Sequence, residues 1–265
     1  MINQSNKEKV LNALKNKNLV KIISGIQNYD KQKTLNVAMA AEMGGATGLD
    51  ICDESEIIKT VRASVQLPLF VSSIDSKKLL NAQDLGADVL EIGNYESFYK
   101  EDKMFTQKEI REIVKSVKKS LDENVLLCCT IPATLEIENQ VKLAKELLDL
   151  GVDILQSEGF SPDTPVSDRK DKTFNDILKS ASTLANTIEL RKALPNAHII
   201  CASGITNITV PLALAVGASG IGIGTYINSL LTQVEMEERV REVVESINQF
   251  VPQYLQTAKS LALQV

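Results

Sequence analysis

Short apolar runs alternate with longer amphipathic runs along the whole chain. Runs rich in Val, Ile and Leu predict strands, and apolar positions at a 3.6-residue spacing predict the helices between them. The expected strands are 20–24, 48–52, 69–73, 89–92, 125–130, 154–157, 199–202 and 220–223. The expected helices are 31–43, 54–64, 76–85, 107–121, 135–150, 173–194, 206–216 and a long segment from 226. This order predicts a (β/α)8 TIM barrel, an α/β fold, with a doubly wound sheet as the alternative.

A repeated pattern supports the barrel. Four segments read helix end, Gly, small residue, polar residue, strand: MGGATGLDIC (43–52), LGADVLEIGN (85–94), LGVDILQSEG (150–159) and VGASGIGIGT (216–225). The glycine in each is expected to end a helix where the chain turns sharply into a strand. Because these segments precede every second strand, a pair of βα units recurs four times, as a closed eightfold barrel requires.

The two ends of the chain add helices to a single predicted domain, 1–265. Residues 1–18 contain SNKE, a capping-box pattern, and predict a short helix that closes the bottom of the barrel. The barrel itself is expected over 19–250. After the break that Pro252 suggests, residues 251–265 predict a separate C-terminal helix that packs on the barrel or on a partner chain.

Charge and composition narrow the function. The net charge of −5 shows no basic surplus for a nucleic-acid partner, and no apolar run reaches the ~20 residues of a membrane span. The four Cys lie in apolar runs without C-x-x-C spacing, which favours core thiols over a metal site or a catalytic thiol. The single His, His198, begins the seventh strand at the bottom of the barrel, so acid–base chemistry falls to Lys and carboxylates.

The repeat also indicates a polar layer inside the barrel. Asp50, Glu91, Gln156 and Gly222 occupy its equivalent position, and alternate strands of this fold contribute to one interior layer. Lys21 is the basic residue within a strand core and is expected to pair with Asp50 or Glu91. We expect Lys21, Asp50 and Glu91 to be catalytic, with Lys21 as proton donor, general base or imine former. The alternative is a buried ion pair that only fixes the packing.

Further polar residues follow the strands at the same end. Asn94 and Glu158 are expected to bind substrate together with Gln156, with helix capping as the alternative role. Two long segments, 94–106 and 159–173, lie on this face and are expected to act as lids or partner surfaces, or else to be solvated loops.

Two small-residue loops predict a phosphate site. ASGIT follows the seventh strand and GIGT follows the eighth, the place where barrels of the phosphate-binding type hold the anion. Backbone N–H groups and hydroxyls would bind it, and the expected residues are Ser203, Gly204, Gly222, Gly224 and Thr225. The alternative is that these glycines serve tight turns only.

Several segments together resemble one family. They are SGIQNYD, GGATGLDIC, LPLFVSS, GADVLEIGNYESFY, LGVDILQSEGF and CASGITNITVPLALAVGASGIGIGT, spanning about 20–228. They resemble the hypothetical chloroplast reading frame twenty-three family of algal plastids and cyanobacteria. The resemblance implies a TIM-type barrel in the plastid stroma, or in the cytoplasm of a cyanobacterium, and assigns no catalytic residue. The phosphate-type ending is also similar, more distantly, to ribulose-phosphate-binding and flavin-dependent barrels.

Three functions remain open from the sequence. The favoured one is an enzyme acting on a small phosphorylated metabolite by proton transfer or by lyase or synthase chemistry. The alternatives are a flavin mononucleotide enzyme and a non-catalytic sensor or assembly factor, for which the long loops and the C-terminal helix would serve partners, a homo-oligomer included. No metal site is predicted, since two carboxylates could bind Mg²⁺ but nothing marks a full ligand set.

Overall fold

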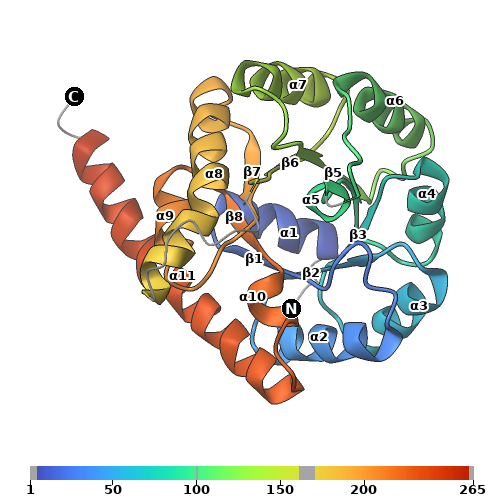
Figure 1. The fold of residues 1–265 in the computed structure, drawn as a ribbon, viewed down its shortest axis with the longest axis horizontal. Helices are drawn as coiled ribbons and strands as arrows, with labels where there is room; N and C mark the ends of the chain where they lie inside the picture. The colour runs from blue at the N-terminus through green and yellow to red at the C-terminus, as the bar shows by residue number, and fades with distance from the viewer. Residues whose placement is uncertain (1–4, 100, 161–170, 263–265) are drawn as a thin grey trace.

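Eight parallel strands close into a barrel with helices around its outside in the computed structural model of the chain (Figure 1). The structure describes residues 5–99, 101–160 and 171–262. Neighbouring strands follow the chain order, and β8 pairs with β1 to close the ring. The strands are β1 (Leu19–Ile23), β2 (Gly48–Cys52), β3 (Leu69–Ser73), β4 (Val89–Ile92), β5 (Leu126–Ile131), β6 (Ile154–Ser157), β7 (His198–Cys201) and β8 (Gly220–Ile223). The predicted TIM barrel is confirmed, and every strand end lies within one residue of its expected position.

The helices largely match the amphipathic segments. They are α1 (Asn6–Lys15), α2 (Lys31–Met43), α3 (Ser55–Ser64), α4 (Ser76–Asp84), α5 (Glu96–Tyr99), α6 (Gln107–Lys118), α7 (Ile137–Asp149), α8 (Lys172–Ala193), α9 (Val210–Ala215), α10 (Thr225–Asn228) and α11 (Gln233–Ala262). The α9 helix begins later than its apolar pattern predicts, with Pro211 in its first turn. A proline fits there because the first N–H groups of a helix need no partner within it.

The C-terminal prediction is wrong in one respect. Instead of ending at 250 and being followed by a separate helix over 251–265, α11 is one helix from Gln233 to Ala262. A proline removes one backbone hydrogen bond from a helix, and a helix of this length can continue across that gap. The first half of α11 buries Met236, Val240, Val243 and Ile247 at helical spacing. Its far end extends beyond the ring of helices (Figure 1).

The N-terminal helix closes the bottom of the barrel as expected. Ser5 accepts a hydrogen bond from the backbone N–H of Glu8, and the Glu8 carboxylate accepts one from the backbone N–H of Ser5, which completes the capping box. The apolar face of α1 packs into the lower interior of the barrel. This cluster consists of Val10, Ala13 and Leu14 from α1 with Leu19, Phe70, Val89, Leu126, Cys128, Ile154 and Ile200 from the strands. The lower half of the interior is therefore apolar and filled.

The four repeat glycines have the backbone conformation that their position requires. Gly45, Gly86, Gly151 and Gly217 have φ values of +84°, +98°, +87° and +104°. Each follows the last turn of a helix, where a left-handed residue redirects the chain at little steric cost only if it lacks a Cβ. The repeat therefore sets the register of the even-numbered strands.

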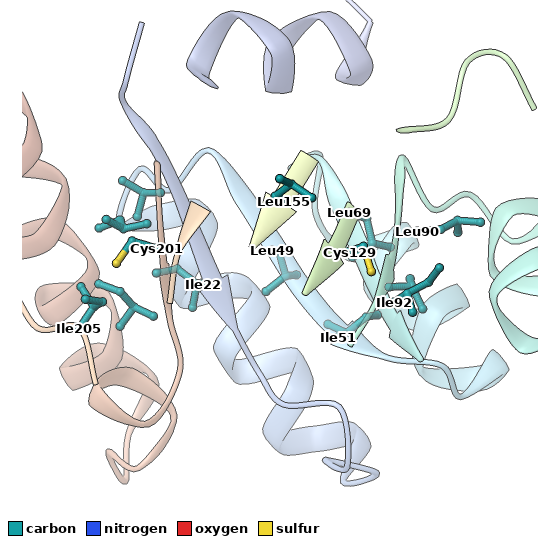
Figure 2. Close-up of a cluster of buried hydrophobic side chains, with 14 of the residues drawn as sticks. Ile22, Leu49, Ile51, Leu69, Leu90, Ile92, Cys129, Leu155, Cys201 and Ile205 are labelled. Carbon is teal, nitrogen blue, oxygen red and sulfur yellow. The ribbon is translucent and has the colours of Figure 1, made fainter. Parts of the chain in front are cut away.

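The outward side chains of the strands form the main core with the helices. Ile22, Leu49, Leu90 and Leu155 belong to it, and Figure 2 shows such side chains around the strands. Because side chains alternate along a strand, the inward positions of the same strands line the interior, which is apolar below and holds buried polar groups above. Among the described residues, no helix combines the length and the apolar character that crossing a bilayer demands.

Candidate functional site

A buried lysine occupies the centre of the upper barrel interior. Nζ of Lys21 lies 2.5 Å from Oε2 of Glu91 and 3.7 Å from Oδ2 of Asp50. All three side chains are buried, with Lys21 and Glu91 at 0% exposure. The Lys21 ammonium also lies 5.1 Å from the centre of the Phe70 ring. Phe70 belongs to the apolar cluster that fills the lower interior, directly below the charged groups. The structure thus brings the three predicted catalytic residues together.

Strand register explains why a long side chain fits at this point. Lys21 stands opposite Gly48 on β2 and opposite Gly222 on β8. Neither neighbour has a side chain, so Lys21 can extend across the interior towards β4, where Glu91 lies. A Cβ on Gly48 would lie 3.0 Å from the Phe70 ring, which shows how closely the space is filled.

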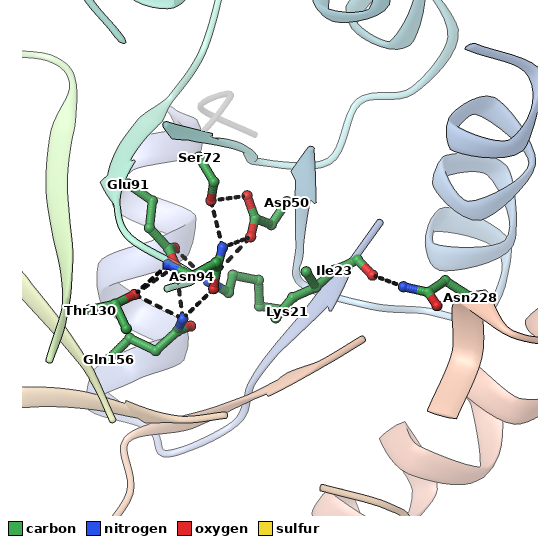
Figure 3. A network of polar contacts seen from close by, with 9 residues as sticks. All are labelled: Lys21, Ile23, Asp50, Ser72, Glu91, Asn94, Thr130, Gln156 and Asn228. Carbon is green, nitrogen blue, oxygen red and sulfur yellow. Dashed lines mark hydrogen bonds and ion pairs between the residues drawn. The ribbon is translucent and has the colours of Figure 1, made fainter. Parts of the chain in front are cut away.

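Hydrogen bonds join the charged cluster to amide and hydroxyl groups (Figure 3). Nδ2 of Asn94 donates to Oδ2 of Asp50 at 2.9 Å and to Oγ of Ser72 at 2.8 Å. Nε2 of Gln156 donates to Oδ1 of Asn94 at 2.8 Å and to Oε1 of Glu91 at 2.9 Å. Asn94 is partly exposed and has a left-handed backbone with φ of +61°. It therefore covers the charged cluster on the side of the barrel mouth.

The electrostatics of the cluster give its members different protonation behaviour. Burial raises the pKa of Asp50 to about 7, and repulsion from Glu91 adds to the effect while Lys21 opposes it. Burial lowers the pKa of Lys21, but attraction to Glu91 and Asp50 outweighs it, so that pKa lies above its ordinary value. At neutral pH Lys21 stays an ammonium, whereas Asp50 can exchange a proton.

The segment after β4 lies over the mouth and is held there by Glu158. Figure 1 places α5 inside the ring of outer helices. The buried Glu158 carboxylate accepts hydrogen bonds from the backbone N–H of Glu96 at 2.6 Å and from the Tyr99 hydroxyl at 2.7 Å. Burial raises the pKa of Glu158 to about 8. Glu158, expected to bind substrate, is thus directed at α5 and is separate from the Lys21 cluster.

The loop after β7 has an acidic neighbour. The Ser203 hydroxyl donates a hydrogen bond of 2.8 Å to Oε2 of Glu96. Ser203 and Gly204 both have left-handed backbones, with φ of +74° and +69°. A Cβ on Gly204 would lie 2.5 Å from the carbonyl oxygen of Lys179, so this glycine is required by its contact with α8.

The loop after β8 offers more space. Gly224 is partly exposed and Thr225 is exposed at the start of α10. A Cβ on Gly224 would come no closer than 3.7 Å to another residue. Gly222 lies deeper and is buried, and a Cβ there would meet Ala202, Ile23 and Oε1 of Gln156 at 3.0–3.3 Å. Gly222 therefore does not line an open anion-binding site. Asn228 at the end of α10 donates to the carbonyl oxygen of Ile23 at 3.0 Å and ties this loop to β1.

The sequence reasoning missed four residues of this site. Ser72 on β3 and Thr130 on β5 complete the polar layer, and Glu96 and Tyr99 connect α5 to the barrel. Ser72 and Thr130 are polar residues at inward positions of otherwise apolar strands. Their alternation with apolar residues in the sequence could have identified them. The predicted lid over 159–173 lies largely outside the described residues.

The four cysteines and the single histidine lie outside the Lys21 cluster. All four cysteines are buried and free of disulfides, Cys128 within the apolar layer below Lys21. His198 is half-buried at the bottom end of β7, and burial lowers its pKa. Within the described part of the chain, no group of three or more His, Cys, Asp or Glu side chains is arranged to hold a metal ion.

Solved structures of similar fold include enzymes named for phosphorylated compounds. The thiamine phosphate pyrophosphorylase of Pyrococcus furiosus aligns with a TM-score of 0.58 and 16% identity, over 89% of this chain and 98% of that one. A 3-hexulose-6-phosphate synthase aligns with a TM-score of 0.59 and 14% identity, over 86% and 99% of the two chains. The orotidine 5'-phosphate decarboxylase of Pyrococcus horikoshii aligns with a TM-score of 0.59 and 12% identity, over 86% of this chain and 99% of that one. At these identities the likeness establishes the TIM-barrel fold.

Sequence relatives come from algal lineages. The "Uncharacterized protein ycf23" of Pyropia yezoensis is 40% identical over 231 residues, which are 87% of this chain and 83% of the relative. The protein of the same name from Cyanidium caldarium is 38% identical over 249 residues, 93% of this chain and 95% of the relative. The family model described as "Protein of unknown function (DUF561)" matches residues 4–252. The resemblance to the plastid reading frame is thereby confirmed: the chain is related to the ycf23 proteins and belongs to the DUF561 family.

Proposed function

We propose that this protein is an enzyme that acts on a small phosphorylated metabolite by proton transfer, within a lyase, isomerase or synthase reaction. The observation that carries the proposal is the buried Lys21–Asp50–Glu91 cluster, in the upper interior beneath the loops that follow the strands. Active sites of TIM barrels lie at this end, and perturbed ionisable groups gather at functional sites.

The protonation states favour particular roles. An ammonium with a raised pKa is a poor nucleophile, so Lys21 suits proton donation or stabilisation of an enolate oxygen better than imine formation. Asp50, with a pKa of about 7, suits proton transfer near neutral pH. Glu91, 2.5 Å from Nζ of Lys21, would hold the ammonium in place. Asn94 and Gln156 would position the substrate.

Phosphate would bind at the loops after β7 and β8, where Ser203, Gly224 and Thr225 are the exposed or partly exposed candidates. The space beside Gly224 supports this placement, and so do the phosphorylated compounds in the names of the similar barrels. Gly204 would contribute backbone only, since its missing side chain serves the contact with α8. Gly222 would allow Gln156 to approach β8. An incoming phosphate would replace the Glu96 carboxylate at the Ser203 hydroxyl.

The substrate would reach Lys21 only after Asn94 moves. The Asn94 side chain bonds Asp50, Ser72 and Gln156 above an ammonium of 0% exposure. Asn94 is at the start of the segment that carries α5, so displacement of Glu96 by phosphate and movement of Asn94 would be linked through the backbone. The relatives' source organisms support a location in the plastid stroma or, in a cyanobacterium, in the cytoplasm.

Solvent-proton exchange provides a test that does not need the substrate's full reaction. The protein is incubated in D₂O with a panel of sugar phosphates, and loss of carbon-bound protons is followed by NMR. We expect exchange on at least one compound, loss of that exchange in Lys21→Met, and retained binding of inorganic phosphate by the variant. Exchange at the wild-type rate in folded Lys21→Met would refute the catalytic assignment.

A non-catalytic phosphate sensor is the second candidate, and the complete burial of Lys21 favours it. A sensor would use the ion cluster to stabilise the barrel and α5 to report ligand binding. This function predicts phosphate binding and a change in α5 without proton exchange on any compound of the panel.

A further inference from the structure

One buried acceptor in the polar layer has no partner. Oε1 of Gln156 accepts no hydrogen bond from any described residue, and the residue is 1% exposed. Leaving such an oxygen unpaired is energetically unfavourable, because it loses its hydrogen bonds to water without gaining others. Among the described residues, the other buried side-chain atoms of this kind are outside the polar layer: Asn18 precedes β1, Gln140 is on α7, and the Tyr95 side chain packs in the outer core.

The orientation of this amide is fixed by its neighbours. Nε2 of Gln156 donates to Oε1 of Glu91, to Oδ1 of Asn94 and, at 3.2 Å, to Oγ1 of Thr130. Turning the amide over would place Oε1 against a carboxylate oxygen and an amide oxygen, neither of which can donate. The unpaired atom is therefore an acceptor, and it requires a donor.

Its surroundings place this acceptor between the two halves of the proposed site. Oε1 lies 3.3 Å from the position that a Cβ of Gly222 would take, with Ala202 and Ile23 as the other neighbours. Ala202 precedes Ser203, and Gly222 is two residues before Gly224 in β8 and the loop that follows. The same amide bonds Glu91, the partner of Lys21. A ligand that extends from the β7 and β8 loops towards Lys21 would pass this oxygen.

We propose that Gln156 Oε1 binds a hydroxyl group of the ligand, so that the substrate is a hydroxylated, carbohydrate-type phosphate ester. This inference rests on the proposed function and adds the substrate class to it. A carbonyl or an ionised phosphate oxygen could not satisfy Oε1, because both are acceptors, whereas a hydroxyl on a carbon near the ester can donate to it. A site built to accept a substrate hydroxyl discriminates against the analogue that lacks one.

The test compares glycerol 3-phosphate with n-propyl phosphate, which has the same carbon chain without hydroxyls. Calorimetric titration measures both, and inorganic phosphate, against the wild type, Gln156→Met and Gly222→Ala. Gln156→Met removes the acceptor. Gly222→Ala retains the amide and covers Oε1 with a methyl group, at a backbone position outside the left-handed region, with shifts of a few tenths of an ångström in its close neighbours Ala202, Ile23 and Gln156. The alanine variant serves if the methionine variant does not fold.

We expect the wild type to bind glycerol 3-phosphate roughly tenfold more tightly than n-propyl phosphate. In both variants the ratio should fall close to one, with the affinity for inorganic phosphate unchanged. Equal affinities in the wild type would overturn the inference and indicate a buried water at Oε1. A ratio that persists in the variants would overturn it as well. Binding of none of the three probes would instead refute the phosphate site itself, and this inference with it.

Discussion

The Ser203 hydroxyl donates a hydrogen bond of 2.8 Å to the Glu96 carboxylate, although the residues are 107 positions apart in the chain. This contact joins α5, which follows β4, to the loop after β7 across the barrel mouth. It also places a carboxylate where the proposed phosphate would bind. A carboxylate of the protein itself thus occupies the proposed anion subsite, and a phosphate bound there would compete with it.

Glu96→Gln is therefore expected to increase phosphate affinity. The glutamine oxygen can still accept from Ser203, but the negative charge that repels phosphate is gone, and a gain of roughly five- to tenfold corresponds to about 1–1.4 kcal/mol. Calorimetric titration with inorganic phosphate measures it. Glu101→Gln is the matched control, because Glu101 is on the same segment and its carboxylate accepts a hydrogen bond from the exposed Gln27 side chain, away from Ser203. Unchanged or weaker binding by Glu96→Gln would remove Glu96 from the anion subsite.

Two glycines near the mouth should respond differently to alanine. In Gly204→Ala the new Cβ meets the Lys179 carbonyl oxygen at 2.5 Å on a left-handed backbone, so the free energy of unfolding should fall by about 1–3 kcal/mol. In Gly224→Ala the nearest atom is 3.7 Å away, and the loss should be smaller. Phosphate affinity should nevertheless fall in Gly224→Ala, because the methyl group occupies space proposed for the anion. Urea unfolding and phosphate titration separate the two effects, and a Gly224→Ala protein with normal phosphate affinity would contradict the placement.

Stability should fall as pH rises towards 8. The folded-state pKa of Glu158 is about 8 and that of Asp50 about 7, both above their ordinary values of 4.5 and 3.8. A raised pKa means that the folded protein binds the proton more tightly than the unfolded chain. The resulting stability is complete below about pH 4 and is lost progressively up to pH 8, by at most about 1.4 kcal/mol per pH unit for each group.

Glu158→Gln should remove the Glu158 share of this dependence. Its free energy of unfolding should change less than that of the wild type between pH 5 and pH 8, as measured by urea unfolding across that range. Glu56→Gln is the control, since the Glu56 side chain is on the surface and pairs with the exposed Lys59. A pH dependence identical to the wild type would show that the Glu158 carboxyl is not held protonated by burial.

The polar layer could be predicted because the repeat carries it. Helix, glycine turn and strand recur with a fixed spacing, so Asp50, Glu91 and Gln156 had to face the same way once the barrel closed. The interior position of Lys21 could be predicted because it is a basic residue among apolar strand residues. The position of Gly222 could be predicted from its place in the last repeat. Local periodicity and closure together therefore place an interior layer to within one residue.

The contacts above that layer could not be predicted, for a physical reason. Ser203 and Glu96 meet through tertiary packing of two loops, and no spacing along the chain encodes it. Glu158 directly follows β6, yet its carboxylate is directed at α5. The backbone N–H of Glu96 and the Tyr99 hydroxyl donate hydrogen bonds to it there. The continuity of α11 across Pro252 likewise depends on a helix long enough to lose one hydrogen bond.

The strongest effect is expected at the ion cluster itself. Lys21→Met keeps the length of the side chain but leaves Asp50 and Glu91 buried without their cation, and breaking a buried pair in this way costs about 3–5 kcal/mol. Adding Glu91→Gln removes one uncompensated charge, so the double variant should be more stable than Lys21→Met alone. Urea unfolding at pH 7 measures both, with Lys59→Met of the exposed Lys59–Glu56 pair as the control. If Lys21→Met alone were as stable as the wild type, the ion pair would not stabilise the fold, and the ammonium would be retained for chemistry and not for folding.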